Sequence, residues 1–193
     1  MSDIIIRNIS KSFGDKKVLS DFSEVIPCAK TTVIMGESGC GKTTLVNLIM
    51  GLEKVDDGEI SEVPKNISAV FQDDLLCEDF SAVSNIKAVT GRGLTKEKIA
   101  EALELLELTD KDIRRPVREL SGGMKRRVAI ARAILADSEL IIMDEPFKGL
   151  DDGTRQKTID FVLQETKNRT LIVITHSPEE AELLVSDKVI RMI

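Results

Sequence analysis

Long apolar runs are missing from this chain of 193 residues. The uninterrupted runs, such as residues 171–174, are far shorter than the roughly 18 residues that a helix needs to cross a bilayer. The N-terminus, MSDIIIRNIS, sets three isoleucines between charged residues and lacks the apolar region of a secretory signal. We therefore expect no membrane-spanning segment and a cytoplasmic chain.

Cysteines are few, and acidic residues outnumber basic ones. Cys28, Cys40 and Cys77 are odd in number and show no paired metal-ligand spacing, which predicts reduced thiols in buried or loop positions. The formal net charge of −6 argues against a general nucleic-acid-binding surface, although it does not exclude a local basic patch. Repeats, low-complexity tracts and linkers are absent, so we expect one continuous domain over residues 1–193.

Three short runs rich in β-branched residues are typical of strands buried on both faces of a parallel sheet. They are TTVIM at 31–35, ELIIM at 139–143 and LIVIT at 171–175. Polar or glycine-rich turns follow each run, and open α/β sheets bind ligands at these carboxyl ends of their strands. The sequence thus predicts an α/β fold with its chemistry at that edge.

Helical patterns lie between the expected strands. KTTLVNLIM leads to Gly51 as an expected C-cap, residues 95–108 carry an apolar stripe, and Ser177 followed by proline and two glutamates is typical of a helix start. The stretch from about 75 to 120 has helical but no buried-strand pattern. We expect a helical subdomain over about 75–135, inserted into a core of about 1–74 and 136–193.

A glycine-rich motif, GESGCGKT, follows the first expected strand and opens a helix. It matches the pattern of a phosphate-binding loop, in which backbone N–H groups surround phosphate oxygens. Lys42 would reach the β- and γ-phosphates, and Thr43 would ligate Mg²⁺. The alternative is a plain glycine-rich turn. The expected nucleotide-binding residues of this loop are Gly36, Glu37, Ser38, Gly39, Cys40, Gly41, Lys42, Thr43 and Thr44.

Two acids end the strand-like run LIIMDE. Asp144 at the strand tip can hold Mg²⁺, and Glu145 can act on an attacking water, since a general base must lie within hydrogen-bond reach of that water. Alone, such a pair is more often a solvated strand end. A phosphate-binding loop about 100 residues upstream favours the catalytic interpretation.

Two further polar residues follow expected strands. His176, the single histidine, ends a strand that should lie beside the one before the phosphate-binding loop, where it could bond the γ-phosphate. The alternative is a structural or merely exposed histidine. Gln72 follows the run ISAVF, and its uncharged amide could touch both Mg²⁺ and the water.

A serine and two glycines begin the strong helix pattern in RELSGGMKRRVAIARAI. Ser121 is a good N-cap, and Gly122 and Gly123 leave the first N–H groups open to a close anion. Since one phosphate-binding loop already surrounds one nucleotide, this edge should face a nucleotide on another copy of the chain. The alternative is a glycine-rich helix start without a ligand. The following Lys125, Arg126 and Arg127 are expected to form a solvated face, beside an apolar packing stripe.

The motifs GESGCGKT, FQDD, ELSGGMKRR, LIIMDEP, GLD and ITH stand in the order found in the ATP-binding-cassette (ABC) ATPases, which the whole chain resembles. The resemblance implies a P-loop (RecA-like) core with a mostly parallel sheet, an N-terminal antiparallel β lobe and the helical subdomain. It also implies ATP and Mg²⁺ as ligands, and a head-to-tail homodimer with two ATP molecules between the subunits.

The resemblance implies roles for particular residues. Lys42, Gln72, Glu145 and His176 would be catalytic, with Glu145 as the base and His176 as the switch histidine. Thr43, Gln72 and Asp144 would contact Mg²⁺. Ser121, Gly122 and Gly123 would bind ATP held by the opposing subunit, and Asp151 would communicate across the dimer beside the nucleotide.

The resemblance also places an aromatic ring on adenine. Tyrosine and tryptophan are absent, so Phe13 is the expected residue. Met124 stands where many members have glutamine, and Lys148 with Gly149 replaces a small pair. The short distance from Gly58 to Gln72 predicts a reduced β lobe.

The chain is most similar to bacterial importer subunits of the nitrate, sulfonate and taurine kind. We expect it to power transport through separate permease subunits, with a solute-binding protein as a further candidate partner, at the cytoplasmic face of the membrane and without nucleic acid. The alternatives are a non-transport ABC ATPase that regulates a membrane complex, and a P-loop small-molecule kinase. A kinase would have no use for the Ser-Gly-Gly triplet, and DNA-repair or translation cassettes would need a coiled-coil insertion or second cassette.

Overall fold

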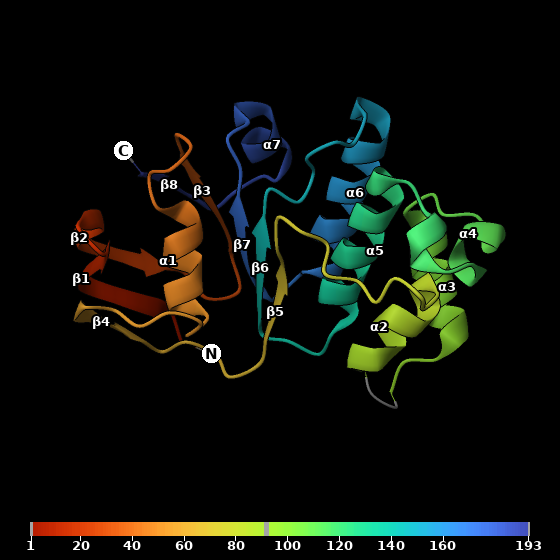
Figure 1. Ribbon diagram of the computed structural model, residues 1–193, viewed down its shortest axis with the longest axis horizontal. Coiled ribbons are helices and arrows are strands. Elements are labelled where there is room, and N and C mark those ends of the chain that lie inside the picture. The colour runs from red at the N-terminus through yellow and green to blue at the C-terminus, as the bar shows by residue number, and fades with distance from the viewer. Residues whose placement is uncertain (1, 91–92, 193) are drawn as a thin grey trace.

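Two β-sheets and a group of helices follow one another along the long axis of the molecule (Figure 1). The structure is a computed structural model that describes residues 2–90 and 93–192. The strands are β1 (Ile4–Phe13), β2 (Lys16–Ile26), β3 (Thr31–Gly36), β4 (Asp57–Ser61), β5 (Ile67–Val70), β6 (Leu140–Asp144), β7 (Thr170–Ile174) and β8 (Lys188–Met192). The helices are α1 (Lys42–Ile49), α2 (Ala82–Thr90), α3 (Lys96–Leu105), α4 (Asp110–Arg114), the 3₁₀ turn η1 (Val117–Glu119), α5 (Gly122–Leu135), α6 (Asp152–Glu165) and α7 (Pro178–Leu183).

The larger sheet is parallel, with strand order β5-β6-β7-β3-β8. The three strands expected from the apolar runs are β3, β6 and β7, and β7 pairs with both β3 and β6. β6 and β7 are buried along their whole length, which explains the absence of polar alternation in their sequences. The expected α/β fold is confirmed, and the strand that precedes His176 lies beside the strand that precedes the glycine-rich loop.

The two faces of this sheet belong to two hydrophobic cores. Alternate residues of β3, β6 and β7 point to opposite faces. We call the first the helical-side core, and it takes Val33, Ile141, Met143, Leu171 and Val173 from the sheet. We call the second the loop-side core, and it takes Ile34, Leu140, Ile142, Ile172 and Ile174.

The smaller sheet is antiparallel, with order β2-β1-β4, and it covers the loop-side core. Ile4, Ile6 and Ile9 of β1 are buried there. Gly58 lies in β4, and the chain passes from β4 to β5 through residues 62–66, so the short distance noted in the sequence leaves no room for a further strand between them. The lobe is therefore a three-stranded sheet.

Helix α1 lies between the two sheets (Figure 1). Its apolar residues Leu45, Val46, Leu48 and Ile49 are all buried in the loop-side core. Met50 is the C-cap residue, and Gly51 follows it with a left-handed φ of 70°. The prediction of Gly51 as the cap itself is thus wrong by one residue, because the left-handed glycine characteristically sits just after the capping residue.

Helices α2 to α5 lie beyond the other face of the parallel sheet (Figure 1). As expected, residues 75–90 and 93–120 form no strand apart from an isolated bridge between Ser81 and Pro116. Side-chain caps set several of the helix starts, since Thr95, Thr109 and Ser121 each accept a hydrogen bond from a backbone N–H of the first turn. Within residues 2–90 and 93–192, none of the helices combines the length and apolar character needed to cross a membrane.

Candidate active site

The glycine-rich loop connects β3 to α1. Gly39 and Gly41 have φ values of 85° and 99°, a conformation that costs other residues about 1 kcal/mol or more. Gly36 is required for a different reason, because a Cβ there would collide with the backbone carbonyl of Met192 and lie 2.7 Å from Cys40 Sγ. The local sequence therefore fixes a tight loop at the carboxyl end of a buried strand.

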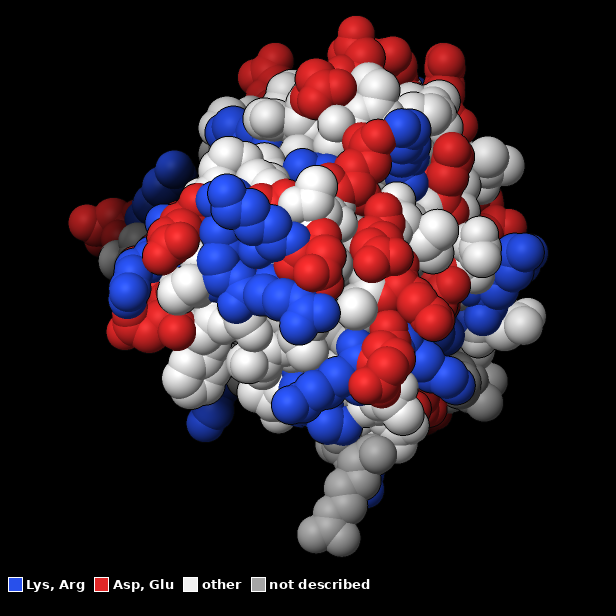
Figure 2. Space-filling view, turned by 90° about the vertical axis from the view of Figure 1, so that its right-hand side faces the viewer, with Lys and Arg blue, Asp and Glu red and all other residues white. Residues whose placement is uncertain are grey.

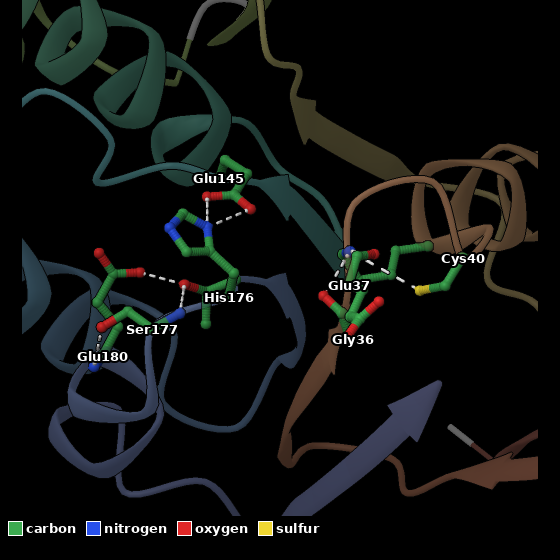
Figure 3. Close-up of polar contacts among 9 residues, drawn as sticks. Gly36, Glu37, Cys40, Glu145, His176, Ser177 and Glu180 are labelled. Carbon is green, nitrogen blue, oxygen red and sulfur yellow. Dashed lines mark hydrogen bonds and ion pairs between the residues drawn. The ribbon is translucent and has the colours of Figure 1, made fainter. Parts of the chain in front are cut away.

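Lys42 holds its ammonium group inside this loop. Its Nζ donates to the carbonyl oxygens of Gly36 at 2.9 Å and Glu37 at 2.7 Å, and it lies 3.8 Å from Cys40 Sγ (Figure 3). The residue is only 9% exposed. A buried cation with three donors, held by exchangeable carbonyl partners, is suited to bind phosphate oxygens.

Asp144 is buried at the carboxyl end of β6. Its Oδ2 accepts a 2.7 Å hydrogen bond from Thr43 Oγ1 at the start of α1. Its Oδ1 is buried and has no hydrogen-bond partner among the residues that the structure describes. Burial raises the pKa of Asp144, and the neighbouring Glu145 raises it further, while Thr43, Gln72 and Lys42 act against the shift. A buried carboxylate oxygen without a hydrogen-bond partner, beside a hydroxyl and an amide, suits a hard divalent cation.

Glu145 and His176 face one another across the ends of β6 and β7. His176 Nδ1 lies 2.9 Å from both carboxylate oxygens of Glu145, and because a carboxylate only accepts, the tautomer with Nδ1–H fits this contact (Figure 3). Glu145 adopts a left-handed φ of 50°, which costs a non-glycine residue about 1–3 kcal/mol, and its N–H donates to Ile174 O at 3.0 Å. The strained backbone turns the chain away from the strand direction just where the carboxylate meets the imidazole.

Three residues around His176 form a ring of hydrogen bonds. Thr175 Oγ1 donates to the carboxylate of Glu180 and accepts from Ser177 N at 3.1 Å, while Ser177 Oγ accepts from Glu180 N at 3.3 Å (Figure 3). Thr175 and Glu180 are buried, whereas the His176 side chain is 69% exposed. The expected helix start at Ser177 is confirmed, and this cap fixes the backbone on both sides of an exposed imidazole whose side-chain contact is with Glu145.

One cavity of about 660 Å³ collects most of the predicted nucleotide residues. Its predicted lining residues are Gly36, Glu37, Ser38, Gly39, Gly41, Lys42, Thr43, Thr44, Gln72, Asp144, Glu145 and His176. Segments separated by more than 100 residues in sequence therefore meet at the carboxyl edge of the parallel sheet. Cys40 belongs to the loop but does not line the cavity.

Three lining residues were not predicted: Lys16, Val18 and Lys148. Lys16 and Val18 come from β2 of the antiparallel sheet, and no motif marks them. Lys148 was noted only as a departure from the family pattern, although its place three residues after Glu145 is a signal that it could face the same cavity. The site thus carries two more cations than the motifs indicate.

Phe13 and Asp151 lie outside this cavity. Phe13 is 47% exposed at the end of β1, paired in register with Lys16, and Lys11 Nζ lies 5.1 Å from its ring centroid. Asp151 is the N-cap of α6, where it accepts from Thr154 N at 3.0 Å. This hydrogen bond lowers the pKa of Asp151.

Ser121, Gly122 and Gly123 also lie apart from the 660 Å³ cavity. Ser121 is exposed and caps α5 by accepting from Met124 N at 3.3 Å. Gly122 and Gly123 line a second cleft of about 450 Å³, which shares Gln72, Glu145 and Lys148 with the first. A Cβ on Gly122 would meet nothing within 4 Å in the described part of the chain, so packing within this chain does not require a glycine there.

The expectation that Lys125, Arg126 and Arg127 form a solvated face is wrong for Arg126. Its residue is 8% exposed, and its guanidinium donates to the carbonyls of Phe71 and Gln72. Arg127 is half-buried and donates to the carbonyls of Gly123 and Leu106, and Lys125 bonds Glu78 at 3.1 Å. A run of three basic residues on a helix points in three directions, which composition alone does not reveal.

Together, the fold and the site define a P-loop nucleotide-binding protein with a separate glycine-rich helix start. The family model described as ABC transporter matches residues 19–148. The aliphatic sulfonates import ATP-binding protein SsuB 1 of Paracoccus denitrificans is 38% identical over 94% of this chain and 76% of its own length. The sulfate/thiosulfate import ATP-binding protein CysA of Gloeobacter violaceus is 36% identical over 98% of this chain and 59% of its own length.

Solved structures agree with the sequence comparisons. The dimeric ABC transporter cassette MJ0796 superposes with a TM-score of 0.86 at 26% identity, over 98% of this chain and 94% of that one. The same cassette in a dimeric post-hydrolysis state, bound to ADP and Pi, gives a TM-score of 0.84. This chain belongs to the ABC transporter family, as an ATP-binding, ATP-hydrolysing cassette.

Proposed function

We propose that two copies of this chain pack head to tail and hydrolyse ATP between the glycine-rich loop of one and the Ser121–Gly123 triplet of the other. One observation supports this most. Most of the residues expected to bind the nucleotide within one chain, from the glycine-rich loop to His176, share a single cavity, while Gly122 and Gly123 lie outside it. Gly122 faces open space, so its missing side chain leaves room for a ligand from outside the chain.

Within one chain, the loop residues Gly36 to Thr44 hold the phosphates. Lys42 exchanges its two carbonyl partners for oxygens of the β- and γ-phosphates, and the backbone N–H groups of the loop and of the α1 start surround the rest. Phe13 offers its exposed ring to adenine beside Lys16 and Val18.

Thr43, Gln72 and Asp144 fit a Mg²⁺ ion. The support is the buried Oδ1 of Asp144, which has no partner among the described residues and lies in a cavity wall shared with the Thr43 hydroxyl and the Gln72 amide. When bound, the cation would neutralise charge on the phosphates during transfer to water.

Glu145 is the proposed general base, and His176 supports it. The Glu145 carboxylate orients or deprotonates a water, and His176 Nδ1–H donates to that carboxylate. This arrangement leaves Nε2 of the imidazole for the γ-phosphate side of the cavity. Gln72 shares the cavity wall and supplies an uncharged amide to the same water.

Across the dimer, Ser121 and the first N–H groups of α5 would contact the γ-phosphate held by the other copy. Asp151, fixed as the cap of α6, would face the partner at the same interface. The proposed catalytic unit therefore needs two copies of the chain, each of which completes the other's site.

We further propose that the dimer powers import through separate permease subunits at the cytoplasmic face of a membrane, with a solute-binding protein as a further partner. The relatives named as sulfonate and sulfate import proteins support this. The helical subdomain of residues 75–135, set on a core of 1–74 and 136–193, is the proposed docking part. The face at the helical end mixes acidic and basic side chains (Figure 2), which gives nucleic acid no continuous basic surface there.

The test is a pair of variants of the purified chain. Glu145→Gln should bind ATP, hydrolyse it at least 100-fold more slowly and accumulate as an ATP-bound dimer in sedimentation experiments. Ser121→Arg should bind ATP as the parent does but form no dimer. Normal turnover by Glu145→Gln would remove Glu145 from its role, and dimer-dependent turnover by Ser121→Arg would refute the arrangement in trans. Co-purification of membrane subunits with the tagged chain tests the transport proposal separately.

A further inference from the structure

Arg126 joins α5 to the segment that carries Gln72. Its guanidinium donates to Phe71 O at 2.6 Å and to Gln72 O, and its Nε lies 3.2 Å from Asp74 Oδ1. Three partners on one short segment therefore contact the three different nitrogens of a single planar guanidinium group. A rigid fork of this kind fixes both the position and the orientation of what it holds.

Arg132 extends the same attachment by almost two turns of α5. It donates to Leu75 O at 2.7 Å and to Asp74 O at 3.0 Å. Two arginines of one helix therefore hold four backbone carbonyls between residues 71 and 75. Because the acceptors are carbonyls, the attachment fixes the path of this segment independently of its side chains.

The contact between Arg126 and Asp74 is largely shielded from water. The Arg126 side chain is 9% exposed and that of Asp74 is 22% exposed. Burial raises the pKa of Asp74, and the charge of Arg126 is the first of the influences that oppose the rise. A half-buried charge pair that also satisfies backbone carbonyls is costly to break, because each group would lose its partner away from water.

The two ends of this connection belong to different nucleotide sites. Gln72 lines the cavity that contains Lys42 and Asp144, whereas α5 begins with the triplet that we propose for the partner's nucleotide. Arg126 itself lines the cleft that lies between them. A displacement of Gln72 on ligand binding would therefore carry the start of α5 with it.

We propose that Arg126 is a positioning residue that makes the Gln72 segment and α5 move as one body, so that filling one nucleotide site presents Ser121–Gly123 to the other. The inference rests on the proposed function, since it requires the dimer with its triplet in trans. Arg126 thereby couples the two nucleotide sites, whereas ATP binding within one chain does not depend on it.

The experiment uses the full chain with Glu145→Gln, which retains ATP, as the parent. A fluorescent ATP analogue reports affinity within one chain, and sedimentation over a range of protein concentrations reports ATP-driven dimerisation. Adding Arg126→Gln should weaken dimerisation at least tenfold while changing ATP affinity less than twofold. Lys125→Gln removes a cation from the same turn of α5 that pairs with the exposed Glu78, and should change both quantities less than twofold.

Arg126→Lys separates positioning from simple stability. Lysine restores the charge beside Asp74 but not the planar fork, so it should restore the melting temperature while dimerisation stays at least fivefold weaker. If Arg126→Gln does not fold, Arg126→Lys decides alone. Parent-like dimerisation by a folded Arg126→Gln, or by Arg126→Lys, overturns the inference. Failure of the Glu145→Gln parent to dimerise with ATP would instead refute the proposed function on which it rests.

Discussion

Asp144→Asn should stabilise the ligand-free chain while it removes Mg²⁺-dependent turnover. In the folded chain, the Asp144 carboxyl is 4% exposed, lies next to Glu145, and has one oxygen bonded to Thr43 and the other without a partner in the described chain. Asparagine keeps an acceptor for Thr43 and removes the buried charge. The proposed Mg²⁺ ligand Asp144 thus lowers the stability of the folded chain as long as no cation is bound.

The magnitude follows from the one unpaired oxygen. An unsatisfied buried neutral group costs about 1–3 kcal/mol, and a charged one costs more. Replacing the carboxylate of Asp144 by an amide should therefore raise the free energy of unfolding by about 1–2 kcal/mol. In a domain of this size each kcal/mol shifts the melting temperature by about 2–4 °C, which predicts a rise of roughly 2–8 °C. The pKa of Asp144 is raised on folding, so its charge lowers stability as the pH rises above the unfolded value of about 4. The advantage of asparagine should therefore be full near pH 7 and vanish toward pH 4.

The assay is thermal unfolding of both chains in EDTA at pH 7.5 and at pH 4.5, then at pH 7.5 with Mg²⁺ and ATP. Saturating ligand at about 100 times its dissociation constant stabilises the parent by about 2.7 kcal/mol, so the order of the two melting temperatures should invert. Asp160→Asn, an exposed carboxylate on α6, is the control and should change stability by less than about 0.5 kcal/mol. A less stable Asp144→Asn in EDTA at pH 7.5 would refute the reasoning.

Three further predictions concern two residues near the site and an arginine at the opposite edge of the parallel sheet. Gly122→Ala should raise the free energy of unfolding of the single chain by about 0.4–1 kcal/mol in urea, because a Cβ there meets nothing within 4 Å and alanine favours helix. It should nevertheless slow ATP turnover, because the added methyl group would stand where the partner's nucleotide approaches. Faster turnover would argue against that close approach. Thr175→Val should lower the free energy of unfolding by about 1–3 kcal/mol, because it leaves the buried Glu180 carboxylate without its donor. It should also lower kcat more than it raises KM, because the hydrogen-bonded ring would no longer hold the backbone around His176. An unchanged kcat would mean that the ring does not position His176. Arg169→Met should lower the urea midpoint without altering ATP affinity, since Arg169 donates to the carbonyls of Ile134 in the last turn of α5 and of Ala136 and Ser138 just beyond it. A midpoint equal to the parent's would show that this cap contributes nothing.

The parts of the site that were predictable are those in which a contiguous motif determines its own geometry. GESGCGKT needs two of its glycines, Gly39 and Gly41, for φ values of 85° and 99°, and Asp144 and Glu145 end an apolar run that is typical of a buried strand. The rule that parallel strands gather their carboxyl ends at one edge predicted that the residues after β3, β6 and β7 contribute to one site, and β7 does pair with β3.

The remaining parts depend on contacts between distant segments. Lys16 and Val18 reach the cavity only because β2 pairs with β1 and covers α1, and no local pattern contains that information. Arg126 was misjudged because a charged residue on a helix is usually solvated, and its acceptors, the carbonyls of Phe71 and Gln72, are more than 50 residues away. Propensity and periodicity describe one segment at a time, whereas these residues act between segments.

The alternation of neighbouring strand residues between the helical-side core and the loop-side core gives this cassette two separable regions for sequence change. Val33 and Ile34 are adjacent in the chain, yet one packs under the helices and the other under α1. Substitutions at sites more than about 7–10 Å apart without shared partners generally add independently. Libraries that vary buried residues of α2 and α3, such as Ile86 and Leu103, change positions outside the lining of the nucleotide cavity and can therefore seek new partner preferences while that lining is kept.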